Sequence, residues 1–74
     1  MMKIKVKNTE EFKKLLLIKG FSQRTFSKSV KISNPHFNLI INGERNPSGK
    51  VAKKIADGLN VRFEDIFFVD YACK

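Results

Sequence analysis

Asn38 and Leu39 carry side chains that could contact the edges of DNA base pairs. An asparagine amide can form two hydrogen bonds with adenine, at N6 and N7, and a leucine can contact the methyl group of thymine. At about 100° per residue, a helix that begins after Ser33 would place Pro35, Asn38, Leu39 and Asn42 on one face. This face is therefore a candidate surface for reading bases.

The same face has a second interpretation as a protein-binding surface. No lysine or arginine occurs in residues 34–42, so a basic side chain that binds guanine, the commonest base-specific contact, is missing. An exposed leucine can instead anchor a protein partner. Two hypotheses follow for Pro35, Asn38, Leu39 and Asn42: they contact bases, or they contact a protein.

Two short helices with a tight connection would position this face. Ser22 and Ser33 are residues typical of helix N-caps. Phe26 and Val30 would point inward from the helix that begins after Ser22, and Ile32 would anchor the connection in the core. This is the layout of a helix-turn-helix, in which the second helix is presented outward.

Three further helices complete the predicted domain. Asn8, with Glu11 three residues later, and Ser48 are the expected N-caps of helices over residues 9–19 and 49–59, and a short fifth helix is expected over 63–68. Left-handed conformations are expected where helices end, at Gly20, Lys31 and Asn60. The predicted inward residues are Phe12, Leu15 and Leu16, then Phe37, Ile40 and Ile41, then Val51, Ala52, Ile55, Ala56 and Leu59.

The composition limits the classes of function. At 74 residues the chain has room for one domain, and a net charge of +8 with a pI near 9.9 indicates a polyanionic partner or a solubilising surface. One cysteine and one histidine cannot form an internal disulfide or a tetrahedral metal site. The sequence has no membrane span, signal peptide or set of catalytic residues. We expect a cytoplasmic, nucleoid-associated protein that is not an enzyme and has no cofactor.

The two ends of the chain form separate predicted segments. Residues 3–7 alternate lysine with Ile4 and Val6, which predicts a short strand or extended arm. We expect the arm to pack on the domain or pair with a second copy rather than lie along DNA phosphates. We therefore divide the chain into an N-terminal arm at 1–8, a helix-turn-helix domain at 9–69 and a C-terminal tail at 70–74. We expect Cys73, in the tail, to be inert rather than a nucleophile.

Three segments together resemble the lambda-repressor-like helix-turn-helix family, the Cro and phage-repressor type also called XRE. They are KGFSQRTFSKSVKIS at the first two helices, INGERNPS after the third and AKKIADGLNV in the fourth. The resemblance covers residues 12–67. It implies an all-α domain of five helices that binds duplex DNA, usually as a homodimer on a pseudo-palindromic operator.

The resemblance also implies roles for individual residues. Gln23 matches a glutamine that braces a phosphate and the recognition helix, although it could be merely a surface residue of the first turn. Ser33 matches the cap of that helix, and Arg45 and Asn46 match a loop that meets the DNA backbone. From its position on the helix, His36 is either a polar neighbour of the core or a phosphate contact. Lys50 is either a solvated surface residue or a phosphate contact at the start of its helix. The predicted DNA-binding set is Gln23, Ser33, Asn34, Pro35, His36, Asn38, Leu39, Asn42, Arg45, Asn46 and Lys50.

This chain departs from the family pattern at a pair of positions. Many members have an arginine on the first helix and a glutamate near the end of the third, which form a partly buried ion pair. Leu16 and Ile41 occupy these positions here. Because an apolar pair can replace a buried ion pair without loss of stability, the joint change supports the alignment.

Two hypotheses for the function follow. The first is a DNA-binding transcriptional regulator, encoded by a phage or mobile element, that reads an operator in a lysis–lysogeny or similar switch. The alternative is a protein-interaction module of the modulator-of-repression or antirepressor type. It would bind a separate repressor protein through Pro35, Asn38, Leu39 and Asn42.

Overall fold

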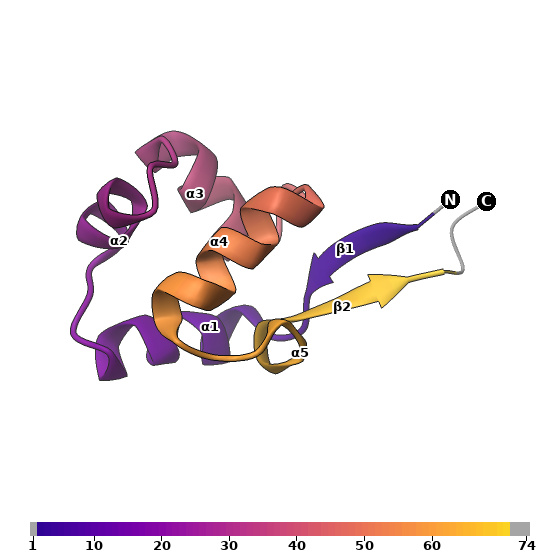
Figure 1. The fold of residues 1–74 in the computed structure, drawn as a ribbon, viewed down its shortest axis with the longest axis horizontal. Coiled ribbons are helices and arrows are strands. Elements are labelled where there is room, and N and C mark those ends of the chain that lie inside the picture. Colours follow the sequence, from indigo (N-terminus) through magenta and orange to yellow (C-terminus); the bar gives the residue numbers. More distant parts are fainter. Residues whose placement is uncertain (1, 72–74) are drawn as a thin grey trace.

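The computed structural model describes residues 2–71, and these form five helices and a small sheet (Figure 1). The fold class predicted from the sequence is confirmed, with a two-stranded sheet added to the helices. In chain order the elements are β1 (Lys3–Val6), α1 (Thr9–Ile18), α2 (Gln23–Ser29), α3 (Asn34–Ile41), α4 (Gly49–Leu59), α5 (Phe63–Ile66) and β2 (Phe67–Asp70).

Phenylalanine rings form the centre of the core. Phe12 on α1 makes edge-to-face contacts with Phe37 on α3 and Phe67 on β2, each with ring centroids 5.9 Å apart. Phe26 on α2 contacts Phe37 at 5.2 Å. Leu16, Ile40, Ile41, Ala52, Ile55, Ala56 and Leu59 are also buried, as predicted, while Leu15, Val30 and Val51 are half-buried. The helices therefore pack through the faces that their periodicity predicts.

All four predicted N-caps form. The side chains of Asn8, Ser22, Ser33 and Ser48 each accept a hydrogen bond from the backbone N–H three residues later, at 3.0–3.3 Å. Thr25 completes a capping box at α2, because its hydroxyl accepts a hydrogen bond from the Ser22 N–H at 2.9 Å. These caps satisfy backbone donors that the first turn of a helix leaves unpaired.

Four helices end with a left-handed residue just past the last turn: Gly20, Lys31, Gly43 and Asn60, with φ of 82°, 60°, 76° and 58°. In each case the following residue donates a backbone hydrogen bond across six residues, as from Phe21 N to Leu16 O at 2.9 Å. This is the Schellman motif. At Lys31 a side chain with a Cβ adopts a conformation that glycine adopts without steric cost.

Replacing Lys31 with glycine should therefore stabilise the fold. The left-handed conformation costs an L-residue about 1–2 kcal/mol, part of which the greater chain entropy of unfolded glycine offsets. We expect the free energy of unfolding to rise by about 1 kcal/mol, measured by urea denaturation with circular dichroism. Lys28→Gly, which removes the same charge inside α2, should instead lower it by about 1 kcal/mol. A loss of stability in Lys31→Gly would contradict the interpretation.

The structure corrects the predicted fifth helix. It ends at Ile66 rather than 68, and the next residues form β2, which pairs antiparallel with β1 so that Lys3 faces Asp70 and Val6 faces Phe67. The arm could pack on the domain, pair with a second copy or lie along DNA phosphates. In the structure it packs on the domain, because Ile4 and Val6 contact the core. The boundary proposed between residues 69 and 70 falls inside β2, and Cys73 lies outside the described residues.

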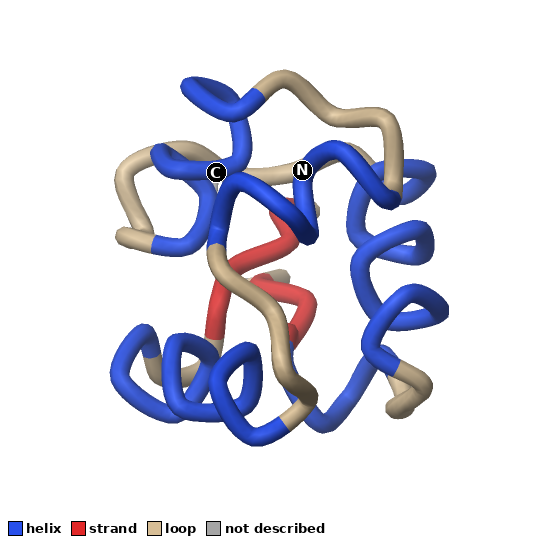
Figure 2. Tube along the Cα trace, turned by 90° about the vertical axis from the view of Figure 1, so that its left-hand side faces the viewer, coloured by secondary structure: helices blue, strands red, loops and turns tan. Residues whose placement is uncertain are grey.

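The sheet forms one end of the molecule. The two strands run side by side beyond the helices in Figure 1, and they lie behind the helices in Figure 2, which views the molecule from the helical end. Helix α2 lies at the other end, and α3 lies between α2 and the sheet, with the loop after α3 beside β1.

Candidate nucleic-acid interface

Helix α3 is held against α2 by apolar and polar contacts. Besides the contact between Phe26 and Phe37, Ile32 is buried in the connection, and its N–H donates to the Ser27 carbonyl at 2.9 Å. Ser27 is itself buried at 2% exposure, and its hydroxyl donates to the Arg24 carbonyl at 3.0 Å and lies 3.4 Å from Asn34 Oδ1. The start of α3 is thus fixed relative to α2.

A chain of side-chain amides connects the outer surfaces of the two helices. Asn38 Nδ2 donates to Gln23 Oε1 at 2.8 Å, and Asn42 Nδ2 donates to the Asn38 carbonyl at 2.9 Å and approaches Asn38 Oδ1 at 3.3 Å. The side-chain amide of Asn38 is therefore held in one orientation by Gln23 on one side and by Asn42 on the other. An amide has two donor hydrogens and two acceptor lone pairs, so one of each remains for a ligand. Asn38 can still form the paired donor and acceptor contacts that adenine requires.

The other predicted site residues differ in exposure. Ser33, Asn34 and Pro35 are exposed at the start of α3, and His36 and Asn42 are half-buried. Leu39 is half-buried rather than the exposed residue that the helical periodicity predicts. Its side chain can therefore offer a base or a partner only part of its surface.

The loop after α3 is fixed to the end of that helix. The Leu39 carbonyl accepts hydrogen bonds from the backbone N–H groups of Glu44 and Arg45, at 2.9 and 3.2 Å. Arg45, Asn46 and Lys50 are exposed beyond this turn, with Lys50 in the first turn of α4. The backbone holds Arg45 next to α3, while its side chain extends into solvent.

Lys5 is a candidate contact residue that the sequence interpretation missed. A shallow hollow of about 330 Å³ is lined by Lys5 on β1 together with Arg45 and Asn46. Lys5 also forms an ion pair with Asp70, at 3.1 Å between Nζ and Oδ2. The alternation of residues 3–7 predicts a strand, but only the tertiary fold shows that this strand lies beside the loop after α3.

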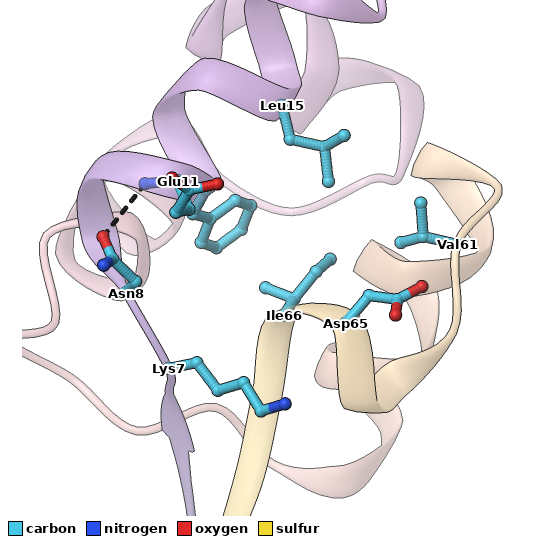
Figure 3. Close-up of a pocket in the computed structure, with 8 residues that line it drawn as sticks. Lys7, Asn8, Glu11, Leu15, Val61, Asp65 and Ile66 are labelled. Atoms are coloured by element: carbon cyan, nitrogen blue, oxygen red, sulfur yellow. Dashed lines mark hydrogen bonds between the residues drawn. The ribbon is translucent and has the colours of Figure 1, made fainter.

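A second hollow lies away from the helix-turn-helix. It measures about 370 Å³ between α1 and α5, and Leu15, Val61 and Ile66 face it (Figure 3). Asp65 also borders the hollow, but its carboxylate accepts a hydrogen bond from the Arg62 N–H at 3.0 Å and so caps α5. Because the lining is mainly apolar and contains none of the predicted site residues, we do not assign this hollow to DNA binding.

Residues 2–71 contain no group of three or more His, Cys, Asp or Glu side chains that could hold a metal ion. Within the same residues, no helix is both long enough and apolar enough to cross a membrane.

Comparison with known proteins identifies the family. Residues 12–66 match the family model described as helix-turn-helix. The chain belongs to the lambda-repressor-like (XRE) helix-turn-helix family. This helix-turn-helix protein is also 41% identical over 58 residues to the uncharacterized HTH-type transcriptional regulator YqaF of Bacillus subtilis (strain 168), across 78% of this chain and 75% of the relative. No solved structure matches it.

Membership places this helix-turn-helix protein in a family of DNA-binding transcription regulators. Its departure from the usual ion pair also fits the structure. Leu16 and Ile41, which occupy the two positions, are both buried in the core, at 3% and 0% exposure. The core of this protein therefore contains apolar side chains at both positions where the resemblance implies an ion pair.

Proposed function

We propose that this protein is a sequence-specific DNA-binding regulator that inserts α3 into the major groove of its operator. The observation that carries the proposal is the chain of amides from Gln23 through Asn38 to Asn42, because it orients a base-reading side chain on the outer face of α3. In this account Asn34, Asn38 and Leu39 contact bases. Gln23, Ser33, His36, Arg45, Asn46 and Lys50 contact or approach the DNA backbone.

The proposal extends to the biological setting. The protein would act as a cytoplasmic, nucleoid-associated regulator encoded by a phage or mobile element, and would control a lysis–lysogeny or similar switch. A homodimer on a pseudo-palindromic operator would place two copies of α3 about 34 Å apart, one turn of the duplex. The excess of basic residues, 15 Lys and Arg against 7 Asp and Glu, supports a polyanionic partner.

The experiment is a binding titration at increasing salt. A duplex would be selected from a random library, and its affinity measured by fluorescence anisotropy. The logarithm of the binding constant should fall linearly with the logarithm of salt concentration, by about 0.9 per phosphate contact. Lys50→Gln should reduce this slope by about one for each protomer bound. Lys54→Gln, which removes the same charge one turn further along α4, should leave the slope unchanged. Affinity independent of salt would overturn the proposal.

One observation favours the alternative function, in which the protein modulates a separate repressor. Helix α3 has no lysine or arginine, and its exposed Pro35 and half-buried Leu39 supply apolar surface beside Asn38 and Asn42. Such a surface suits a protein partner. If this function is the correct one, selection from the random library should recover no duplex, and the protein should instead bind the repressor encoded beside its gene.

A further inference from the structure

Two large apolar side chains at the end of α1 are exposed to solvent. Leu17 is 75% exposed and Ile18 is 69% exposed, whereas Phe12 and Leu16 on the same helix are buried. Among residues 2–71, the other exposed side chains of this kind lie on or beside the strands of the sheet. Scattered apolar residues are normal on a protein surface, but two neighbours beside a hollow are typical of an interaction site.

The hollow beside Leu17, which we call the α1 groove, has a mainly apolar lining and measures about 300 Å³. The residues that line it are Lys13, Leu16, Leu17, Phe21, Ser22 and Gln23. The half-buried Phe21 ring packs edge-to-face on Phe26 with centroids 5.1 Å apart, and the Phe21 N–H donates to the Leu16 carbonyl at 2.9 Å. The groove is thus held in shape before any partner binds, which lowers the entropic cost of binding.

The segment that forms the α1 groove carries only positive charge. Lys13 lines the groove, and Lys14 and Lys19, on the second half and at the C-cap of α1, are exposed. No aspartate or glutamate occurs from residue 12 to residue 43, because the acidic residues of α1 are confined to its first turn. The ion pairs elsewhere in the structure use Lys5 and Lys53. These three lysines can therefore pair with carboxylates of a partner.

The combination of charge and apolar surface decides between the possible occupants. A second copy would bring the same lysines against each other, in a chain whose net charge is already +8. A DNA duplex offers phosphates to the lysines but would leave Leu17 and Ile18 without apolar partners. A protein segment with both carboxylates and apolar side chains complements both features.

We propose that the end of α1 is a docking surface for an acidic, amphipathic helix of another protein. One apolar side chain of that helix would enter the α1 groove beside Phe21, and apolar side chains one turn away would pack on Leu17 and Ile18. Aspartate or glutamate side chains that flank its apolar face would pair with the three lysines. The apolar contacts supply most of the affinity, and the charge pairs at the rim select the partner.

The docking surface borders the face that is proposed to bind DNA. Gln23 lines the α1 groove, and its Oε1 accepts a hydrogen bond from Asn38 Nδ2 at 2.8 Å. The carboxylates of a docked helix would repel a phosphate held by Gln23, so the partner and a duplex should weaken each other's binding. This consequence rests on the proposed function, whereas docking does not, and the first test is made without DNA.

The test uses a synthetic helical peptide as the probe. The fluorescein-labelled peptide would carry leucines at positions i, i+3, i+4 and i+7 with glutamates beside them, and a control peptide would have lysine in place of every glutamate. In anisotropy titrations, we expect the wild type to bind the glutamate peptide with a micromolar dissociation constant and the lysine peptide at least about tenfold more weakly. No binding of the glutamate peptide at millimolar concentration would overturn the proposal.

Matched variants separate the docking surface from a general attraction between unlike charges. The double variant Leu17→Ser and Ile18→Ser keeps the net charge, and it should weaken binding of the glutamate peptide at least about tenfold. Tyr71→Ser, at a similarly exposed residue beside the sheet, should leave binding unchanged. Lys13→Gln should weaken binding more than Lys54→Gln, which removes the same charge on α4. Equal affinities of the double variant and Tyr71→Ser would overturn the proposal.

Two further measurements identify the occupant and its relation to DNA. Addition of the selected duplex should weaken binding of the glutamate peptide, and an unchanged affinity would contradict the opposition between partner and DNA. A protein that binds the peptide through Leu17 and Ile18 but binds no duplex would support the docking surface and contradict the proposed function. Self-association or binding of anionic vesicles through the same two residues, with no affinity for the peptide, would overturn the proposal.

Discussion

Alanine at Asn38 is expected to weaken binding to the selected duplex by about 1–3 kcal/mol, that is, by roughly 5- to 150-fold. The variant loses the two hydrogen bonds to adenine, and it also releases Gln23, whose Oε1 accepts from Asn38 Nδ2 at 2.8 Å. Because base contacts carry specificity, affinity for an unrelated duplex should be nearly unchanged. Fluorescence anisotropy titrations with the two duplexes measure both effects.

The amide chain supplies the controls for this prediction. Asn42→Ala removes a brace from Asn38 but leaves its amide in place, so its effect should be smaller. Gln23→Ala and Asn38→Ala should be non-additive in the double variant, because the two side chains are directly bonded. Asn38 is exposed, so the melting temperature should scarcely change. Equal losses of affinity for both duplexes would show that Asn38 does not read bases.

Gly58→Ala is expected to destabilise the fold by about 1–3 kcal/mol, although alanine at an exposed helix position is about 1 kcal/mol more favourable than glycine. A Cβ at Gly58 would lie 2.7 Å from Val30 Cγ1 and 3.0 Å from two ring carbons of Phe26. Valine is stiff about χ1, and the Phe26 ring is held between Phe21 and Phe37, with centroids 5.1 and 5.2 Å away. Helix α4 would therefore have to move away from α2.

A second glycine of the same helix is the matched control. A Cβ at Gly49 would meet nothing within 4 Å, so Gly49→Ala should be neutral or slightly stabilising. In a Val30→Ala background, which removes the nearest atom, Gly58→Ala should cost less than in the wild type. Urea denaturation of these variants gives the free energies of unfolding. Equal stability of Gly58→Ala and Gly49→Ala would contradict the close approach of the two helices.

The features that could be predicted from the sequence depend on neighbouring residues. Ser22, Ser33 and Ser48 form caps because each accepts a hydrogen bond from an amide three residues away. The left-handed residues at Lys31 and Asn60 likewise follow from where an amphipathic stretch ends. In both cases a single helical turn contains the whole interaction, so its residue types are sufficient evidence.

The features that were missed depend on residues far apart in the chain. Phe67 and Phe68 suit a helix or a strand equally, and only the partner strand at the other end of the chain decides the outcome. Leu39 is less exposed than predicted, and the loop that follows α3 turns back to bond with its carbonyl. The bond between Gln23 and Asn38 joins two helices, and the role of Gln23 came from the family resemblance. The roles of Gln23 and Asn38 in DNA binding stay predictions.

The central claim is that the outer face of α3 reads base pairs, and the specificity ratio tests it most directly. This ratio compares the dissociation constants of the protein for a scrambled duplex and for the selected duplex, at physiological salt and without any partner protein. A base-reading face predicts a ratio of at least about 10³, which should fall markedly in Asn38→Ala. A ratio near one, with both duplexes bound only through their phosphates, would contradict the claim.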